Sequence, residues 1–516
     1  MKMKYLYHSL AFCALLVAAL STGGCYKDQS TQATFEIPEL RVSGLDTAMH
    51  ILFGQEITLS VTALQDNRTE SDFTYLWEMD FHAGDSDERI VLSEEKTMSL
   101  KVNSSPSSMP YAVTCTVTDT QTGLFVVKMC RLYVQSALGE GLLVAYERDG
   151  TYDIDLVASE SITYGFKDPA VRYTRGVYSL VNDETVPDKI LSMNAKYATN
   201  GQVYNDPHIL IGTEKHLFRV DPQTFKKGDA DEMLFSNVRE SSFRTTGMWN
   251  CSGYASLAIV NGNLYGNTTH IDNSYSKVPI GVSPSDFIRP DNLAFGRMDQ
   301  GWVMAFNETV GKFYACHGAF ISNSTMTEVQ TGFGIDLSGS QCLGSGPARS
   351  NGGAFIIKTA DGNYYIAYLY INDSVYYLRQ VTLPEADDIV SVAFCDNVDI
   401  MYYTTSSSVY AVVFGASEAI SRKLSWAPDS DQERITMVKH YVQAWWGSMQ
   451  YGTFNVYPYT LPTNRTQILI VTHNDTTGEG KIYVRPFNLA TGMLTYKNGG
   501  TFDGFGEITA IAPTFV

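Results

Sequence analysis

The stretch Leu142–Leu156, LLVAYERDGTYDIDL, contains two strand-like segments joined by a short polar turn. Its first half is apolar, and its second half alternates polar with apolar side chains. Between them, Asp149-Gly150 is a strong hairpin signal, because glycine readily takes the positive φ that tight turns require. The stretch is therefore typical of a β-hairpin, and we interpret it as the unit from which the C-terminal part of the chain is built.

The same pattern of an apolar strand, a polar turn and a strand with Tyr or Phe recurs along the chain. Seven copies begin at Leu142, Ile209, Leu257, Val303, Ala354, Asp399 and Ile468. A spacing of about 50 residues with two evident strands per copy indicates four-stranded blades, so residues 138–516 are predicted to form a β-propeller of about seven blades. The segment Gly506–Val516 is expected to complete the first blade and close the ring, which hides the sheet edges. A right-handed β-helix is the alternative, although its rungs are much shorter than these repeats.

Residues 34–136 have a different pattern, in which alternation of period two dominates. The segments Phe73–Met79 (FTYLWEM) and Tyr111–Asp119 (YAVTCTVTD) are the clearest of five or six short strands separated by turn-forming residues. Together they predict a small β-sandwich. These two strands resemble those of a PKD (polycystic kidney disease) or immunoglobulin-like module, in which Trp77 would be the core tryptophan. The expected fold class is thus all-β, with a sandwich followed by a propeller.

The N-terminus has the features of a bacterial lipoprotein signal. A lysine-containing start precedes the 11-residue apolar run Leu10–Leu20, and small residues lead from this run to Cys25. The run is too short for a membrane-spanning helix, which needs about 20 residues. We therefore predict that residues 1–24 are a signal peptide, that Cys25 is lipidated, and that residues 25–33 are a linker. Ordinary secretion with Cys25 as a free thiol is the alternative.

The residues after Cys25 and the overall charge indicate where the protein works. Tyr26-Lys27-Asp28 resembles the export signal that sends lipoproteins of Bacteroidetes to the outer face of the outer membrane. The predicted location is thus the outer membrane, with a lipid anchor and the folded part facing the cell exterior. The formal net charge is −18 for the whole chain, and no basic stripe is present. A chain with this charge repels phosphates, so nucleic acid is not an expected partner.

Cysteine spacing leaves two interpretations open. Cys115 and Cys130 each alternate with apolar residues on neighbouring predicted strands, so both are expected on the apolar side of a hairpin. A disulfide there is compatible with an exported protein, and two buried thiols explain the pattern equally well. The cysteines show no CxxC or Cys/His ligand spacing, so neither a metal site nor a cofactor is predicted.

The segment Trp426–Asn464 is longer than the repeat requires and is rich in aromatic residues. Exposed rings stack on sugar faces or peptide side chains at low entropic cost, so they are candidate ligand-binding or partner-binding residues. The set is Tyr441, Trp445, Trp446, Tyr451, Phe454 and Tyr457. The alternative is that these rings pack inside a long hairpin of one blade. Trp249 and Trp302 lie near the starts of blades, where core packing is the expectation.

Signals for catalysis are weak. The chain contains no GxSxG or HExxH motif and no P-loop. Asp153 and Asp155 would lie on one face of a strand, but this spacing alone does not specify a glycosidase pair, so no catalytic residue is predicted. Three short segments match the O-glycosylation pattern of Bacteroidetes, with Thr47, Ser374 and Thr476 as the acceptor residues.

The lipobox, the PKD-like sandwich and the Tyr-rich propeller entered by GEGLLVAYERDGTYDIDL together resemble the PKD-like family lipoproteins of Bacteroidetes. The resemblance implies an accessory surface lipoprotein of a Sus-like nutrient-uptake system. Its partners would be a TonB-dependent transporter and the lid lipoprotein of that transporter. Its function would be to bind or present an oligosaccharide or peptide without cleaving it.

Two other classes of function remain open at this point. A propeller-fold hydrolase or peptidase would gather titratable residues in the funnel of the propeller. A purely structural docking subunit would instead present a flat apolar face to its partner, whereas a binding module would present a solvent-facing aromatic cluster.

Overall fold

A computed structural model of the protein describes residues 38–514, except 53–55, 81–88, 103, 105–108, 136–139, 164–165, 167, 197–207, 236–237, 253–254, 269–287, 297–301, 318–324, 416, 443–462 and 496–498. The chain divides into two compact units, one ending at Tyr133 and the other beginning at Val134. The predicted lipidation site, Cys25, lies outside the described residues.

The N-terminal unit is built from antiparallel strands. Its five-stranded sheet has the order β2 (Ala48–Leu52), β9 (Phe125–Gln135), β8 (Tyr111–Asp119), β5 (Phe73–Asp80) and β6 (Arg89–Ser93). Two ribbons accompany this sheet: β1 (Arg41–Ser43) with β4 (Thr62–Leu64), and β3 (Glu56–Ser60) with β7 (Thr97–Lys101). A short 3-10 turn, η1 (Glu70–Asp72), leads into β5.

Alternation along the strands places the core of this unit. Phe73, Tyr75, Trp77 and Met79 of β5 are buried, whereas the residues between them are exposed or half-buried. Trp77 is completely buried, and its Nε1 donates a hydrogen bond of 2.8 Å to the backbone oxygen of Glu95. The predicted sandwich and its core tryptophan are therefore confirmed.

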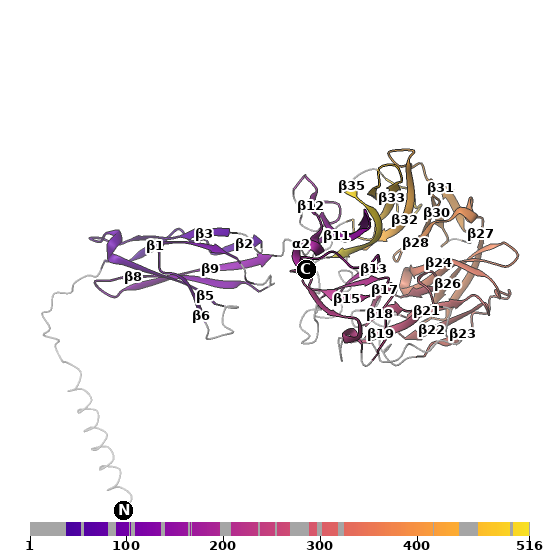
Figure 1. The fold of residues 1–516 in the computed structure, drawn as a ribbon, viewed down its shortest axis with the longest axis horizontal. Coiled ribbons are helices and arrows are strands. Elements are labelled where there is room, and N and C mark those ends of the chain that lie inside the picture. The colour runs from indigo at the N-terminus through magenta and orange to yellow at the C-terminus, as the bar shows by residue number, and fades with distance from the viewer. Residues whose placement is uncertain are drawn as a thin grey trace, which may run out of the picture. The chain divides into compact units, whose positions relative to one another are not determined.

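The C-terminal unit is a ring of antiparallel sheets, which Figure 1 shows following one another around a centre. The described residues form seven such blades. Blade 1 has β36 (Glu507–Thr514), β10 (Gly141–Arg148), β11 (Thr151–Ala158) and β12 (Arg172–Thr174); blade 2 has β13 (Ile190–Lys196), β14 (His208–Thr213), β15 (Leu217–Val220) and β16 (Lys227–Ala230); blade 3 has β17 (Thr245–Ser252), β18 (Ala255–Val260) and β19 (Asn263–Thr268).

The remaining blades follow the same order from the centre outward. Blade 4 has β20 (Leu293–Phe295), β21 (Trp302–Asn307), β22 (Lys312–His317) and β23 (Thr327–Val329); blade 5 has β24 (Gln341–Ala348), β25 (Gly352–Lys358), β26 (Tyr364–Tyr370) and β27 (Val375–Val381). Blade 6 has β28 (Ser391–Phe394), β29 (Ile400–Thr404), β30 (Val409–Val413) and β31 (Ile420–Lys423); blade 7 has β32 (Glu433–Tyr441), β33 (Gln467–Asn474), β34 (Glu479–Pro486) and β35 (Gly500–Phe505). The helical segments among the described residues of this unit are α2 (Val177–Asn182), η2 (Asp231–Leu234), η3 (Pro290–Asn292), η5 (Arg349–Asn351) and η6 (Ala386–Asp388).

The C-terminal strand closes the ring. β36 pairs with β10 from Gly141 opposite Thr514 to Glu147 opposite Glu507, so the last strand of the chain becomes the first strand of blade 1. Apolar side chains then join blade 1 to blade 7, where Ile508 and Ile511 share one core cluster with Leu469. Similar apolar clusters lie between every other pair of neighbouring blades. The all-β fold and the predicted seven-bladed propeller are confirmed.

The seven predicted hairpins are the two middle strands of the seven blades. The inner strands were harder to recognise, because five of them contain a one-residue β-bulge against the second strand of their blade. The extra residues are Leu191, Thr246, Leu343, Thr436 and Thr509, and β17 has a second register shift between Asn250 and Ser252. A bulge breaks the alternation of the strand and redirects its side chains. Leu191, Thr246 and Thr509 consequently face the centre of the ring.

Candidate functional site

The inner strands of all seven blades line a central channel with a volume of about 450 Å³. This volume lies within the range of sites that bind small molecules. Much of the lining is polar, with hydroxyl or amide groups from six residues: Ser192, Asn194, Thr246, Ser345, Ser391 and Thr509. Three of these hydroxyls already bind backbone groups of a neighbouring blade: Ser192 donates to Thr245 O at 3.0 Å, Ser345 donates to Leu293 O at 2.8 Å, and Ser391 accepts from the Val438 N–H at 3.1 Å. Their remaining hydrogen-bonding capacity faces the channel.

One wall of the channel is aromatic. Trp249 of β17 is half-buried, and its ring lies 5.9 Å from the ring of Phe295 on the inner strand of blade 4. Gly247 makes this position possible, because a Cβ atom there would lie only 2.3 Å from the Trp249 indole. A partly exposed indole offers a flat apolar surface with one N–H donor, which suits stacking on a sugar or on a planar peptide group.

A lysine lies on another wall. Lys439 of β32 lines the channel and remains accessible to water, although protein surrounds it. Burial lowers the pKa of its ammonium group, because a low-polarity environment disfavours the charged form. In the described part of the chain, no carboxylate lies within ion-pair distance of this ammonium group.

A second, more polar pocket of about 640 Å³ adjoins the channel where the inner strands of blades 4, 5 and 6 begin. We call it the mouth pocket; it shares Asp291, Ser345, Ser391 and Val392 with the channel. Arg289 binds Glu308 through two hydrogen bonds of 2.8 and 2.9 Å. Hydrogen bonding to Glu308 raises the pKa of Arg289, whereas burial raises the pKa of Asp291. The Arg289–Glu308 pair is thus held in place before any ligand arrives.

His440 also lines the channel, but its imidazole contacts protein groups on both sides. Its Nδ1 lies 3.5 Å from Asp396 Oδ1, and its Nε2 lies 3.1 Å from the backbone oxygen of Arg465. Arg465 Nε donates to the same Asp396 oxygen at 3.0 Å. The His440 side chain is only 4% exposed. This arrangement ties blade 6 to blade 7 and does not present a free nitrogen to the channel.

The structure changes the interpretation of the aromatic segment. Tyr441 is 1% exposed and packs between blades 7 and 1, where its hydroxyl donates to the backbone oxygen of Ile162 at 2.6 Å. Tyr441 borders the channel at the end of the inner strand of blade 7, but its ring is buried in the core, so the prediction of an exposed, ligand-facing ring is wrong. Trp445, Trp446, Tyr451, Phe454 and Tyr457 lie outside the described residues, and their role stays a prediction.

Asp153 and Asp155 have structural partners. Asp155 accepts hydrogen bonds of 2.7 Å from Arg175 Nη1 and from the backbone N–H of Gly176. Asp153 accepts one of 2.8 Å from the backbone N–H of Ile154 and also binds the Ser179 hydroxyl. Both carboxylates thereby fix the start of α2 against blade 1.

The two cysteines of the sandwich are free thiols, so the disulfide alternative is wrong for this structure. The strand register explains why: Cys115 of β8 lies opposite Lys128, and Cys130 of β9 lies opposite Val113. Burial raises the pKa of Cys115 to about 12, which keeps it protonated. The alternative of two buried thiols is confirmed.

The predicted O-glycosylation acceptors Thr47, Ser374 and Thr476 are all exposed. Ser374 lies in the turn between β26 and β27, and Thr476 lies in the turn between β33 and β34. Their modification stays a prediction that this exposure permits.

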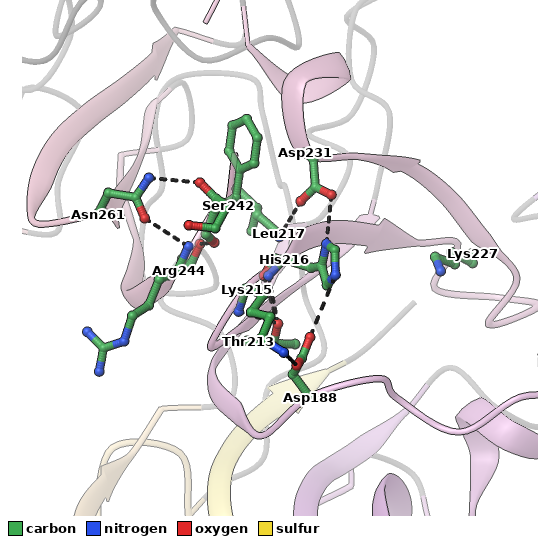
Figure 2. Close-up of polar contacts among 12 residues, drawn as sticks. Asp188, Thr213, Lys215, His216, Leu217, Lys227, Asp231, Ser242, Arg244 and Asn261 are labelled. Carbon is green, nitrogen blue, oxygen red and sulfur yellow. Dashed lines mark hydrogen bonds and ion pairs between the residues drawn. The ribbon is translucent and has the colours of Figure 1, made fainter. Parts of the chain in front are cut away.

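Blade 2 contains a separate cluster of charged side chains (Figure 2). His216 Nδ1 lies 2.8 Å from Asp231 Oδ2, and His216 Nε2 lies 3.6 Å from Asp188 Oδ2. Lys215 Nζ lies 3.1 Å from the other oxygen of Asp188, and the backbone N–H of Leu217 donates to Asp231. Both ring nitrogens thus face carboxylates, so the cluster holds the β14–β15 turn to its neighbours. Among the described residues, no group of three or more His, Cys, Asp or Glu side chains has the arrangement of a metal site.

Comparison with known proteins finds one family whose model matches part of the chain. A sequence model of the PKD-like family matches residues 25–189, which cover the N-terminal unit and end immediately before β13 of blade 2. No curated protein matches the chain.

Several solved structures are similar to this chain at low identity and low TM-score. One is a quinonprotein alcohol dehydrogenase-like protein from Bacteroides thetaiotaomicron, with 15% identity, a TM-score of 0.43, and coverage of 93% of this chain and 98% of that chain. Another is the WD40 domain of SCAP from fission yeast, with 11% identity, a TM-score of 0.34, and coverage of 62% and 75% respectively. A third is apo AztD from Citrobacter koseri, with 9% identity, a TM-score of 0.29, and coverage of 59% and 96%.

None of the helices in the described part of the chain has the length and apolar character needed to cross a membrane. Sequence reasoning did not find the channel residues Lys439 and Asp291. The expectation that Trp249 packs in the core holds in part, because its ring packs against the apolar cluster between blades 3 and 4 and also borders the channel. The sequence does contain a signal for Lys439. Alternation places it on the same side of the strand as Met437 and Tyr441, which face the core, and a lysine is unusual at such a position. Recognising that signal requires knowing that β32 is an inner strand.

Proposed function

We propose that this protein is a non-catalytic binding protein that holds an oligosaccharide or peptide in the central channel of its propeller. The observation that carries the proposal is the channel itself, with the half-buried indole of Trp249 on one wall and hydroxyl groups around it. The mouth pocket adds charged groups that are already fixed by their own partners, such as Arg289 with Glu308. Preorganised groups of this kind bind a polar ligand at a lower entropic cost.

The proposal includes a location and a partner. A lipid on Cys25 would anchor the protein to the outer membrane, facing the cell exterior, as an accessory component of a Sus-like uptake system with a TonB-dependent transporter and its lid lipoprotein. The signal-like residues 1–24 support this, and so does the family match, which begins at Cys25. Two acyl chains or more give stable anchoring without a membrane-spanning helix.

Calorimetry with the mature full-length protein in detergent tests the binding function. The probes are a set of plant and host oligosaccharides and a set of short peptides. Trp249→Leu is expected to weaken binding of the best probe about tenfold, because stacking on the indole is lost. Trp302→Leu is the matched control, because the Trp302 indole donates to Asn372 and does not line the channel. Equal affinities of both variants would count against the channel as the binding site.

Anchoring and partnership need a separate experiment. Metabolic labelling with palmitate should mark the wild-type protein and not Cys25→Ser, and affinity capture from native membranes should recover a TonB-dependent transporter. Recovery of the protein in the periplasm without label would contradict the proposed location.

A docking role is the second candidate function, and an exposed apolar stripe on β9 favours it. Phe125, Val127 and Met129 are 61%, 50% and 45% exposed on the outer face of the five-stranded sheet. Their neighbours across the strand pair are Thr118, Thr116 and Thr114. If this stripe contacts the transporter, Val127→Ser should reduce the capture of the transporter and leave ligand affinity unchanged.

A further inference from the structure

Lys439 is the one cation among the described lysine and arginine residues that line the channel. It lies opposite Leu469 in the strand register, so no polar side chain is directly paired with it. A charge that is partly removed from water normally has a counter-ion or shifts its pKa. Lys439 has no carboxylate partner in the described part of the chain, and its side chain is accessible from the channel. A ligand can therefore supply the missing anion.

The other titratable groups of the channel lining are already engaged. Tyr441 donates to Ile162, and His440 lies between Asp396 and Arg465. Asp291 lies at the mouth pocket, beside the Arg289 whose charge opposes the rise of its pKa. None of these groups neutralises the Lys439 ammonium.

A second unsatisfied group lies in the same channel. Thr509 is the bulged residue of β36, and its Oγ1 is buried without a hydrogen-bond partner among the described residues. β36 belongs to blade 1, which adjoins blade 7, so Thr509 and Lys439 come from neighbouring blades. Buried hydroxyls that lack a partner are rare in native structures, and a bound ligand is one explanation.

We propose that Lys439 binds the carboxylate of an acidic ligand in the central channel and thereby selects acidic over neutral ligands. The inference rests on the proposed function, because it assumes that the channel is where the ligand binds. A single ammonium group fits a single negative charge. Phosphate sites more often use arginine forks or clustered backbone N–H groups, and the described channel lining contains no arginine. The carboxylate can come from a uronate of an oligosaccharide or from the C-terminus of a peptide.

Two matched probe pairs distinguish these sources. The first pair is trigalacturonate and its neutral methyl ester, and the second is N-acetyl-trialanine and its C-terminal amide. Calorimetry at pH 7 with the mature full-length protein should show that the acidic member of one pair binds about tenfold more tightly than its neutral partner. The pair that shows the preference identifies the source of the carboxylate.

Variants test whether Lys439 causes this preference. Lys439→Met should remove the difference between acidic and neutral members, and Lys439→Arg should keep most of it because the charge remains. Lys423→Met is the matched control: Lys423 is 57% exposed on β31 and pairs with Glu385. Thermal unfolding of each variant verifies that it is folded.

The outcomes separate the inference from the proposed function. Equal binding of acidic and neutral members, or an unchanged preference in Lys439→Met, overturns the role of Lys439 while the channel remains a binding site. A preference that is lost equally in Lys423→Met also overturns it, since a general charge effect would then explain the result. Failure of every probe to bind overturns both the role of Lys439 and the proposed function of the channel as a binding site.

Discussion

Glu433 and Lys439 lie six residues apart on the same inner strand, β32, but only Glu433 has an oppositely charged partner among the described residues. Glu433 is buried, and its two oxygens accept hydrogen bonds of 2.8 Å from Lys481 and 2.7 Å from the Tyr483 hydroxyl. Thr472 adds a third hydrogen bond of 3.0 Å. Lys439 lines the channel without a carboxylate partner among the described residues.

The difference indicates which charge maintains the fold and which is available for a ligand. Partners from β33 and β34 satisfy Glu433 and enclose it, so this residue fixes blade 7 internally. Lys439 lines the channel that the described inner strands enclose. Four expected outcomes test the comparison, from the largest effect to the smallest.

The largest effect is expected for Glu433→Gln. Removing the buried Glu433 charge breaks its short ion pair and leaves Lys481 with only Asp429, whose carboxylate lies 3.9 Å away, which costs about 3 kcal/mol of unfolding free energy. Urea denaturation measures this loss. Asp475→Asn is the control, because Asp475 is 63% exposed and its contact with Arg434 should contribute less than about 1 kcal/mol. Similar losses in the two variants would show that Glu433 is not enclosed as described.

The stabilising effect of Glu433 should depend on pH. Burial alone raises its pKa, but hydrogen bonds from Lys481, Tyr483 and Thr472 outweigh burial, so the pKa lies below its ordinary value. A carboxyl with a lowered pKa in the folded state stabilises the protein above its unfolded pKa of about 4.3, and this contribution disappears as the pH falls through the lower, folded value. The difference in stability between wild type and Glu433→Gln should therefore shrink below about pH 4. A constant difference from pH 7 to pH 3 would contradict the assignment.

A smaller effect is expected for Tyr441→Phe. The change removes the hydrogen bond to Ile162 and should cost about 1 kcal/mol of unfolding free energy. Because Tyr441 is buried between blades, affinity for any channel ligand should stay the same. Denaturation and calorimetry on the same preparation measure both quantities. A loss of affinity without a loss of stability would restore Tyr441 as a binding residue.

The smallest effect has the opposite sign. Without ligand at pH 7, Lys439→Met should leave stability unchanged or raise it by up to about 1 kcal/mol, because an uncompensated charge leaves the channel. Burial lowers the pKa of Lys439 in the folded state, so the cost of its charge is greatest at neutral pH and vanishes as the pH rises towards the unfolded value of about 10.4. Denaturation at pH 7 and pH 10 measures the change. Clear destabilisation at pH 7 would show that the lysine has a structural partner.

The hairpins could be predicted because of how a propeller buries its strands. The two middle strands of each blade lie between neighbouring blades and are apolar along most of their length, as in Leu257–Val260 and Ile468–Val471. Short polar turns separate them, which gives a repeated signal. The inner strands lack this signal, because part of each one lines a polar channel and, in five of the seven, a bulge interrupts the alternation. For this reason the segment Trp426–Asn464 reads in the sequence as longer than the repeat requires, although it contains the regular strand β32.

The sequence by itself determined the two middle strands of each blade, the turns between them and the closing role of the C-terminal segment, and it indicated the candidate lipid anchor, because these signals lie in short stretches of the chain. Only the tertiary structure decided which side chains meet. Glu433 contacts Lys481, which is 48 residues away in the sequence, and Tyr441 contacts Ile162, which is 279 residues away. Lys439 contacts no carboxylate in the described part of the chain. Assembly of blade 7 brings Glu433 to Lys481, and closure of the ring brings Tyr441 of blade 7 to Ile162 of blade 1. Whether a charge is enclosed or faces the channel therefore depends on tertiary packing.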